Sequence, residues 1–249
     1  LVGSEMCIRD RAKIGYVGAY TYAEVISGYT SFYLGAKSVC PTVTMDVQFT
    51  GSWFSVSDEK SAAQNLIAKG SKLISQHADS MGAPSACEEA GVPNVSYNGS
   101  TLEACPDTFI VSSRIDWVPY FKYIIGQAME EKKIDTDWTG TLATNSVVLT
   151  ELGEKAPAEG TAAAITAAKE KLMNGTLHVF DTANFTVTVT ENKNKNATVD
   201  ENGKLTGYMA DVNPDTQAVE NGIFKESKFR SAPYFDIQID GITLLNSKF

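Results

Sequence analysis

A group of polar and aromatic side chains follows the short apolar runs of this chain. The group comprises Tyr20, Trp53, Gln76, His77, Asp79, Asn98 and Arg114. Together they supply aromatic faces, two amides, an imidazole, a carboxylate and a guanidinium, which are groups that stack on a ligand or form hydrogen bonds with it. This combination favours a small, flat, polar ligand.

Trp53 is the strongest single candidate in this group. It follows Gly51 and Ser52 in a predicted loop, and an exposed indole there is costly unless a ligand stacks on it. His77 and Asp79 have two open interpretations, since they either polarise a ligand or cap the next helix. Arg114 stands where the chain leaves a predicted lobe, a position that favours ligand contact over a plain surface role.

The motifs of catalysis and of cofactor binding are missing from the sequence. Gly15 and Gly18 lack the spacing of a dinucleotide fingerprint, and neither a P-loop motif nor a G-x-S-x-G motif occurs. The two histidines, His77 and His178, have no Cys or Glu at metal-ligand spacing. We therefore expect no catalytic residue, no cofactor and no metal.

Composition narrows the classes of partner. The 249 residues carry 21 basic and 30 acidic side chains, a net charge of −9, which argues against binding to nucleic acid. No apolar run approaches the ~18 residues that a membrane-spanning helix needs. Cys87 and Cys105 flank a predicted strand, and they are either buried thiols or a disulfide formed in an oxidising compartment.

The elements that must position these residues alternate along the chain. Apolar runs predict strands at 13–18, 43–50, 72–76, 92–97 and 108–111, each pair separated by a helix or loop. Ser55 with Asp58 signals a helix start, Gly91 a helix end, and the aromatic stripe from Tyr22 to Ala36 a helix that packs on a sheet. The pattern predicts an α/β fold with a doubly wound parallel sheet, whose ligands lie at the carboxyl ends of the strands.

The rest of the chain has a different pattern. Helices are expected at 119–132 and 161–173, and strands at 139–149, 185–190, 205–209 and 234–245. Residues 1–12 have neither a signal-peptide pattern nor a lipobox, and we interpret them as a foreign or unstructured leader.

Five motifs together resemble the basic membrane protein family, the substrate-binding lipoproteins of ABC transporters that typically capture purine nucleosides. They are Lys13-Ile-Gly-Tyr-Val-Gly18, Phe32-x-x-Gly35-Ala-Lys-Ser-Val, Thr50-Gly-Ser-Trp53 followed by Glu59-Lys60, Gln76-His-Ala-Asp79, and Ser96-Tyr-Asn98. The resemblance runs from Lys13 to about Pro157. It implies that Trp53 is one half of an aromatic sandwich around the ligand. It also implies that Asn98 stands where the family usually has a carboxylate for the ribose, and Arg114 where it usually has a lysine.

The resemblance also implies a periplasmic-binding-protein type I fold and a division of the chain. Residues 13–114 form a largely complete second ligand-binding lobe, residues 115–180 a return segment of a first lobe that is mostly missing, and residues 181–249 a β-rich C-terminal extension. On this interpretation the chain is truncated at its N-terminus, and we expect it to bind its ligand poorly by itself.

The function that follows is an extracytoplasmic solute-binding component of an ABC importer. It takes a purine nucleoside or a nucleobase-like ligand between two lobes and delivers it to permease subunits, without catalysis. A lipid anchor that lies outside this chain would hold it at the cell membrane. Two alternatives remain open, a ligand-sensing domain of a sugar-repressor-like regulator and a nucleoside-cleaving enzyme.

Overall fold

A single mixed sheet organises the part of the chain that the computed structural model describes, which is residues 12–188, 194–212, 214–228 and 233–246. Its strand order is β12-β2-β1-β3-β4-β5-β6. These strands are β1 (Lys13–Gly18), β2 (Thr44–Phe49), β3 (Ile74–Gln76), β4 (Asn94–Tyr97), β5 (Phe109–Ile115), β6 (Val147–Leu149) and β12 (Ile242–Leu244). The helices are α2 (Ala23–Val39), α3 (Val56–Ala68), α4 (Gly82–Ala90), α5 (Val118–Met129) and α6 (Thr161–Met173).

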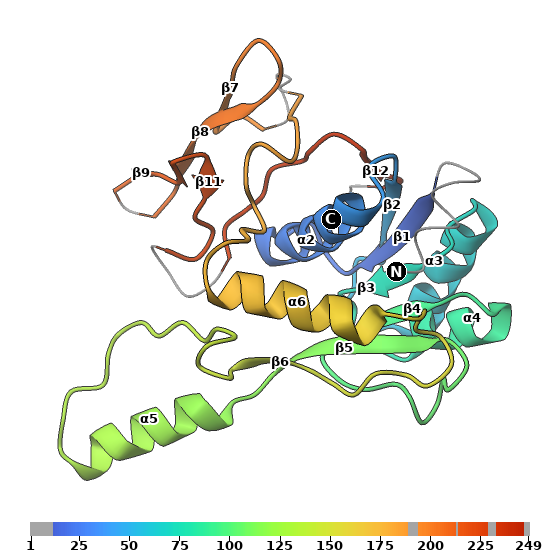
Figure 1. Cartoon of the computed structure of the whole chain (residues 1–249), viewed down its shortest axis with the longest axis horizontal. Coiled ribbons are helices and arrows are strands. Elements are labelled where there is room, and N and C mark those ends of the chain that lie inside the picture. The colour runs from blue at the N-terminus through green and yellow to red at the C-terminus, as the bar shows by residue number, and fades with distance from the viewer. Residues whose placement is uncertain (1–11, 189–193, 213, 229–232, 247–249) are drawn as a thin grey trace.

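The pairing of the strands confirms the predicted doubly wound parallel sheet. Strand β1 pairs in parallel with β2 and β3, β4 pairs in parallel with β3 and β5, and β12 pairs in parallel with β2. Only the edge strand β6 runs antiparallel, against β5, among the pairs described in this sheet. The carboxyl ends of β1 to β5 therefore lie along one edge (Figure 1).

Helices cover both faces of this sheet because successive side chains of a strand point to opposite sides. Ile14 and Tyr16 of β1 join the buried cluster that contains α2, whereas Val17 joins the cluster of α3 and α4. Gly15 faces α3 at close range, since a Cβ there would lie 2.7 Å from Ile74 Cδ1 and 3.1 Å from Leu66 Cβ.

The helix boundaries agree with the local signals in the sequence. The Ser55 hydroxyl accepts the Asp58 N–H at the start of α3, as predicted. Gly91 ends α4 in the left-handed region with φ +64°, where glycine carries no steric penalty. Both signals act through backbone groups within one turn, so the sequence alone locates them.

The C-terminal third packs on α2 and adds an edge strand to the sheet. Phe180 stacks on Phe235 at 4.2 Å between ring centroids, and the Tyr29 hydroxyl of α2 donates to Gln238 Oε1 at 2.8 Å. Strands also form at β7 (Ala197–Val199), β8 (Leu205–Ala210), β9 (Thr216–Gln217), β10 (Val219–Glu220) and β11 (Ile223–Phe224). The predicted strand at 205–209 is thus confirmed as β8, and β12 confirms residues 242–244 of the predicted strand at 234–245. Residues 185–188 and 234–241 lie outside every strand that the structure describes, and residues 189–190 of the predicted strand at 185–190 lie outside the described residues.

Side-chain hydrogen bonds and a single backbone bond, from the Asp240 N–H to the Thr186 carbonyl at 2.9 Å, hold these two extended segments in place of a strand ladder. Asn194 donates from Nδ2 to the Gln238 carbonyl and accepts the Gln238 N–H, both at 2.8 Å. Asp240 accepts the hydroxyl groups of Thr186 and Thr188. Likewise, only Val147–Leu149 of the predicted strand at 139–149 is a strand. Alternating burial predicts an extended chain correctly, but does not say that its neighbour is another strand.

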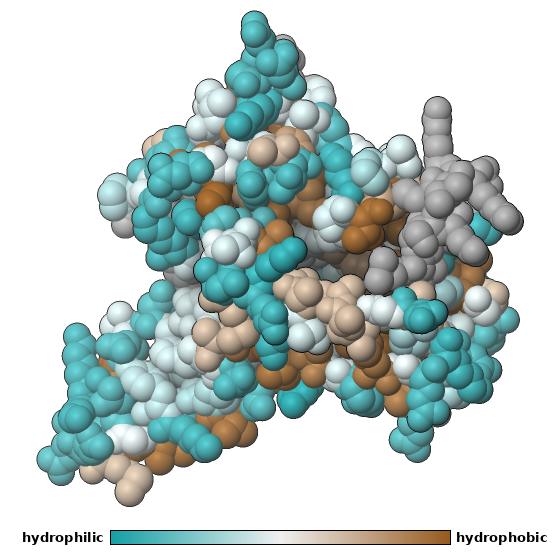
Figure 2. Space-filling view, in the orientation of Figure 1, coloured by the Kyte–Doolittle hydropathy of each residue, from teal (hydrophilic) through white to brown (hydrophobic). Residues whose placement is uncertain are grey.

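Helix α5 projects away from the sheet after β5 (Figure 1). Every residue of α5 is at least partly exposed, and its apolar side chains contribute brown surface at the lower left of Figure 2. Val118, Phe121, Ile125 and Met129 are each 50% exposed or more. This helix therefore carries an apolar surface that the described residues leave uncovered.

Cys87 and Cys105, which the sequence allows to pair, are free and buried thiols in this structure. Burial raises the pKa of Cys87 to about 12 and that of Cys105 to about 11. Both side chains are therefore protonated at neutral pH.

Candidate functional site

The predicted ligand-binding residues lie on the loops at the carboxyl ends of β1 to β5. Because β2, β1, β3 and β4 are neighbours in the sheet, the loops that follow them lie side by side. We call this group of loops the rim: residues 19–22 after β1, 50–55 after β2, 77–81 after β3, and 98–100 after β4, with the end of β5 beside them.

An aromatic cluster is the central feature of the rim. The ring centroids of Tyr20 and Trp53 lie 5.2 Å apart, edge to face, and those of Trp53 and His77 lie 6.3 Å apart. Trp53 is half-buried and packs against the core on its inner side. The structure thus brings together three of the predicted site residues from three different loops.

Tyr22 belongs to this cluster, although the helical spacing assigns it to the buried stripe of α2. It is the N-cap residue of α2, with extended backbone angles of φ −84° and ψ 155°. Its side chain therefore leaves the helix face, is 55% exposed, and stacks on Tyr20 at 5.4 Å. The prediction fails by one residue because the stripe continues past the point where the helix begins.

His77 is the buried member of the cluster. Its Nδ1 lies 3.4 Å from the Tyr16 hydroxyl, and its ring lies 4.4 Å from that of Tyr97. Gly28 of α2 makes room for it, since a Cβ there would lie 2.9 Å from Nδ1. Burial lowers the pKa of His77 to about 4, so the imidazole is neutral at pH 7 and has one donor and one acceptor nitrogen.

Asp79 joins the loop after β3 to the loop of Trp53. Its backbone N–H donates to the Trp53 carbonyl at 2.8 Å, while the residue itself is exposed. Burial raises the pKa of its carboxyl group above the usual range. Tyr97 lies close enough that the Asp79 charge raises the Tyr97 pKa, after the larger effect of burial. Tyr97 lies at the end of β4, one residue before Asn98. Its place at the carboxyl end of a predicted strand is the sequence signal that marks it as a rim residue.

Neither His77 nor Asp79 caps helix α4, so that interpretation is wrong. Helix α4 begins after Met81, which makes no side-chain cap, and the Gly82 N–H donates to the Ser80 hydroxyl at 3.0 Å rather than to His77 or Asp79. Both residues therefore stay available as candidates for ligand contact.

Gln76 has a supporting place behind the rim. It is buried, and its Nε2 donates to the carbonyl groups of Ala78 and Ser80, both at 3.3 Å. Its Oε1 is buried with no partner among the described residues. Direct contact between Gln76 and a ligand stays a prediction.

Asn98 and Arg114 lie at the β4 and β5 side of the rim. Asn98 has φ +67°, a left-handed conformation that asparagine tolerates, and its N–H donates to the Ser113 carbonyl at 2.9 Å. The Arg114 side chain is 44% exposed, and its Nη2 lies 3.9 Å from Asp116 Oδ2. The β4–β5 pairing thus sets both residues beside Tyr97, with their side chains on the surface.

No group of three or more His, Cys, Asp and Glu side chains suited to a metal ion occurs among the described residues. None of the helices within the described ranges has the length and apolar character that would let it cross a membrane.

This mostly parallel α/β sheet has a fold of the periplasmic-binding-protein type. In a doubly wound sheet, ligands bind beyond the carboxyl ends of the strands, where the rim of this chain lies. The fold is similar to that of a solved ABC transporter solute-binding protein from Conexibacter woesei. That similarity has a TM-score of 0.55 and 23% identity, and covers 68% of this chain and 57% of that one.

Residues 8–183 match the family model of PnrA-like ABC transporter substrate-binding proteins, named Bmp. Because this match spans more than half of the chain, the protein belongs to the Bmp family. The resemblance found in the sequence motifs is therefore confirmed.

Two curated relatives match different lengths of the chain. A purine-binding protein of Brucella abortus is 35% identical over 107 residues, which is 43% of this chain and 31% of that protein. A putative ABC transporter glucose-binding protein of Haloferax volcanii is 29% identical over 174 residues, 70% of this chain and 44% of that protein. The chain thus spans less than half the length of either relative.

Proposed function

We propose that this chain contributes a ligand-binding lobe to the solute-binding component of an ABC importer, and that its ligand is a purine nucleoside or a nucleobase-like compound. The observation that carries the proposal is the rim cluster of Tyr20, Tyr22, Trp53 and His77. Stacked and edge-to-face rings present a surface on which a flat heterocycle can lie. The purine-binding relative from Brucella abortus supports this ligand class.

The polar groups around the cluster give such a ligand its hydrogen bonds. A neutral His77 and the amide of Asn98 each donate and accept, whereas Asp79 accepts and Arg114 donates. A purine edge carries both donors and acceptors, so this mixture fits it better than a set of acceptors alone would. Gln76 supports the loop that presents His77 and Asp79.

The apolar surface of α5 supports the proposed division of the protein into lobes. Residues 13–114 form the second lobe, 115–180 return to a first lobe, and 181–249 form an extension. An exposed apolar face of this kind is typical of a surface that another part of a protein covers. A ligand would then be held between the rim and the facing lobe, which supplies the second aromatic ring.

In this proposal the protein binds and delivers its ligand without acting as an enzyme. It binds its ligand outside the cytoplasm, is held at the membrane by a lipid anchor, and passes the ligand to permease subunits. Family membership supports the role in transport, and the two relatives together make purines and glucose the ligands to compare.

Isothermal titration calorimetry against a ligand panel tests this proposal. The panel contains adenosine, guanosine, inosine, their free bases, and glucose. With the facing lobe present, we expect saturable heat with at least one purine, much weaker binding by this chain alone, weaker binding in Trp53→Ala, and recovery of the ligand chemically intact by mass spectrometry. Saturation with glucose alone would refute the purine assignment, and a cleaved nucleoside would refute the role as a binding protein.

A further inference from the structure

Glu59 is a buried carboxylate that joins two loops of the rim. It belongs to the first turns of α3, and its side chain is fully buried. One oxygen, Oε1, accepts the backbone N–H of Ser55 at 3.0 Å. The other, Oε2, accepts the backbone N–H of Ser80 at 3.1 Å. The carboxylate therefore bridges two chain segments that are 25 residues apart in the printed sequence.

The charge of Glu59 is balanced by helix ends rather than by a cation. In the part of the chain that the structure describes, no Lys, Arg or His forms an ion pair with it. It lies instead between the N-termini of α3 and α4, which carry partial positive charge. Gly82 lets the two helix ends approach, because a Cβ there would lie 2.4 Å from the Val56 carbonyl oxygen and 2.8 Å from Glu59 Cβ.

The two bridged residues flank the candidate ligand contacts. Ser55 follows Trp53 by two residues, and Ser80 follows Asp79 directly. Between them, the Asp79 N–H donates to the Trp53 carbonyl at 2.8 Å. These three hydrogen bonds, two to Glu59 and one to the Trp53 carbonyl, connect the loop that carries Trp53 to the loop that carries His77 and Asp79.

We propose that Glu59 is a positioning residue, which holds the Trp53 loop against the His77–Asp79 loop and so sets the geometry of the ligand surface. The inference rests on the proposed function for its link to ligand binding, although the holding role itself is a property of the fold. An ionised carboxylate accepts two N–H groups at once, whereas the amide of glutamine accepts one and turns an NH₂ group toward the other. Glu59→Gln therefore removes one anchor at almost unchanged volume.

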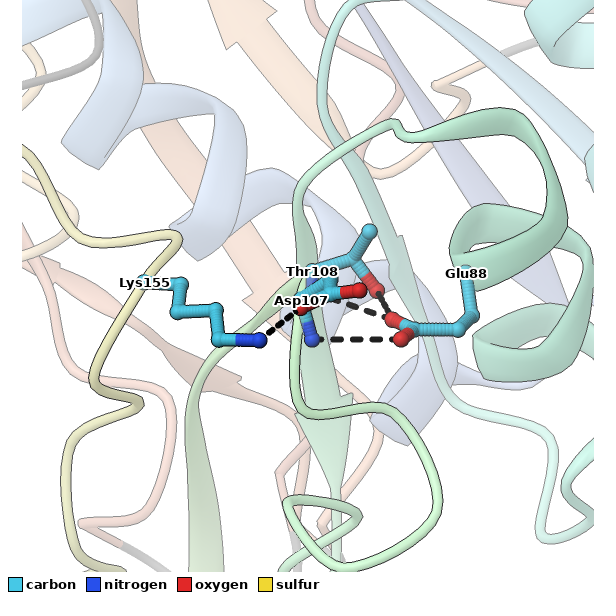
Figure 3. A network of polar contacts seen from close by, with 4 residues as sticks. All are labelled: Glu88, Asp107, Thr108 and Lys155. Atoms are coloured by element: carbon cyan, nitrogen blue, oxygen red, sulfur yellow. Dashed lines mark hydrogen bonds and ion pairs between the residues drawn. The ribbon is translucent and has the colours of Figure 1, made fainter.

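Glu88 offers a matched control within the same chain. It lies on α4, and its Oε1 accepts the Asp107 N–H at 3.1 Å while its Oε2 accepts the Thr108 N–H at 3.0 Å and the Thr108 hydroxyl at 2.6 Å (Figure 3). This network has the same chemistry as that of Glu59. It holds the loop before β5, at the opposite end of the strand from the rim, so Glu88→Gln should not change the rim.

Amide hydrogen exchange measured by NMR on the whole chain separates a positioning role of Glu59 from a contribution to global stability alone. In Glu59→Gln we expect the amide of Ser55 or of Ser80 to exchange about 10- to 100-fold faster, because its hydrogen bond to a charged acceptor is lost. The Asp79 amide should also exchange faster, because its bond to the Trp53 carbonyl joins the two loops that Glu59 no longer holds together. The amide of Met45, in the core of the sheet, should stay within about twofold of wild type. Glu88→Gln should leave the Ser80 and Asp79 amides unchanged, and Glu59→Asp, which is too short to reach both loops, should resemble Glu59→Gln.

The results that would overturn the inference are equally specific. Unchanged exchange of Asp79 in both Glu59 variants would mean that Glu59 does not hold the loops together. Equal acceleration at Asp79 and Met45 would mean that it contributes only to global stability. In the same variants, calorimetry with the tightest-binding purine of the panel should show about tenfold weaker binding for Glu59→Gln and none of this loss for Glu88→Gln. The exchange measurement needs no ligand. It therefore still tests the holding role of Glu59 if no purine binds.

Discussion

The folding stability of this protein should fall in mild acid because of His77. The ring is 8% exposed and is enclosed by Tyr16, Tyr97 and Trp53. Asp79 and Glu24 are acidic groups that act on this set, since their charges raise the pKa of Tyr97 after the larger effect of burial. Protonation of the ring thus places a charge in a site that offers it aromatic rings and hydroxyl groups. For this reason the pKa of His77 in the folded chain is about 4, below the ordinary value of 6.5.

The direction of the effect follows from which state binds the proton. Between pH 6.5 and 4 the unfolded chain binds a proton at His77 and the folded chain does not, so acid favours unfolding. The stability is fully present above pH 6.5 and is lost as the pH falls toward 4. With these two pKa values, the loss between pH 7.5 and pH 5.0 is about 2 kcal/mol. The raised pKa values of the Asp79 and Glu226 carboxyl groups act in the opposite direction.

Denaturant unfolding of wild type and His77→Gln at pH 7.5 and 5.0 isolates this contribution. The carboxyl groups affect both proteins, so the difference between their pH dependences belongs to His77. We expect wild type to lose about 2 kcal/mol more than His77→Gln over this range. His178→Gln, on the connection that follows α6, is the control and should behave as wild type. Equal pH dependence in wild type and His77→Gln would refute the burial of a neutral imidazole at the rim.

Three further substitutions test the rim and its support. Trp53→Ala should weaken binding of a purine by about 5- to 150-fold, the loss expected for one stacked base, and calorimetry with unchanged affinity would remove Trp53 from the site. Arg114→Met should weaken binding by about 10- to 150-fold with an unchanged denaturation midpoint, since the side chain is exposed; a collapse of that midpoint would make Arg114 structural. Gly82→Ala should destabilise the fold by about 1–3 kcal/mol, because its Cβ would lie 2.4 Å from the Val56 carbonyl oxygen. In contrast, Gly35→Ala, which meets nothing within 4 Å, should not destabilise.

The parts of the fold that depend on local signals could be predicted from the sequence. The β1–α2–β2 order, the Ser55 cap and the Gly91 helix end each depend on residues within a few positions of one another. The location of the rim also followed, because parallel strands place all their carboxyl ends at one edge. Trp53, Tyr20 and His77 could therefore be proposed as neighbours although more than twenty residues separate each from the next along the chain.

The parts that depend on distant partners could not be predicted. Glu59 reads in the sequence as one more acidic residue of a helix start, and only the fold shows that its second oxygen meets the Ser80 N–H. Gln76 reads as a rim residue, yet its amide turns back to brace its own loop. In both cases the outcome depends on which backbone groups the packing leaves without partners, and a periodic pattern of side chains does not contain that information.

If the rim of this sheet binds a flat heterocycle on Trp53, the indole N–H signals of the three tryptophans will report that binding most directly. Trp53 lies in the rim cluster, whereas Trp117 and Trp138 belong to the aromatic contacts around α5. During titration with adenosine, guanosine, inosine or their bases, we predict a saturable shift of the Trp53 signal with the other two unchanged, and no shift with glucose. Shifts confined to Trp117 and Trp138, or a Trp53 signal that responds to glucose and to no purine, would contradict the account.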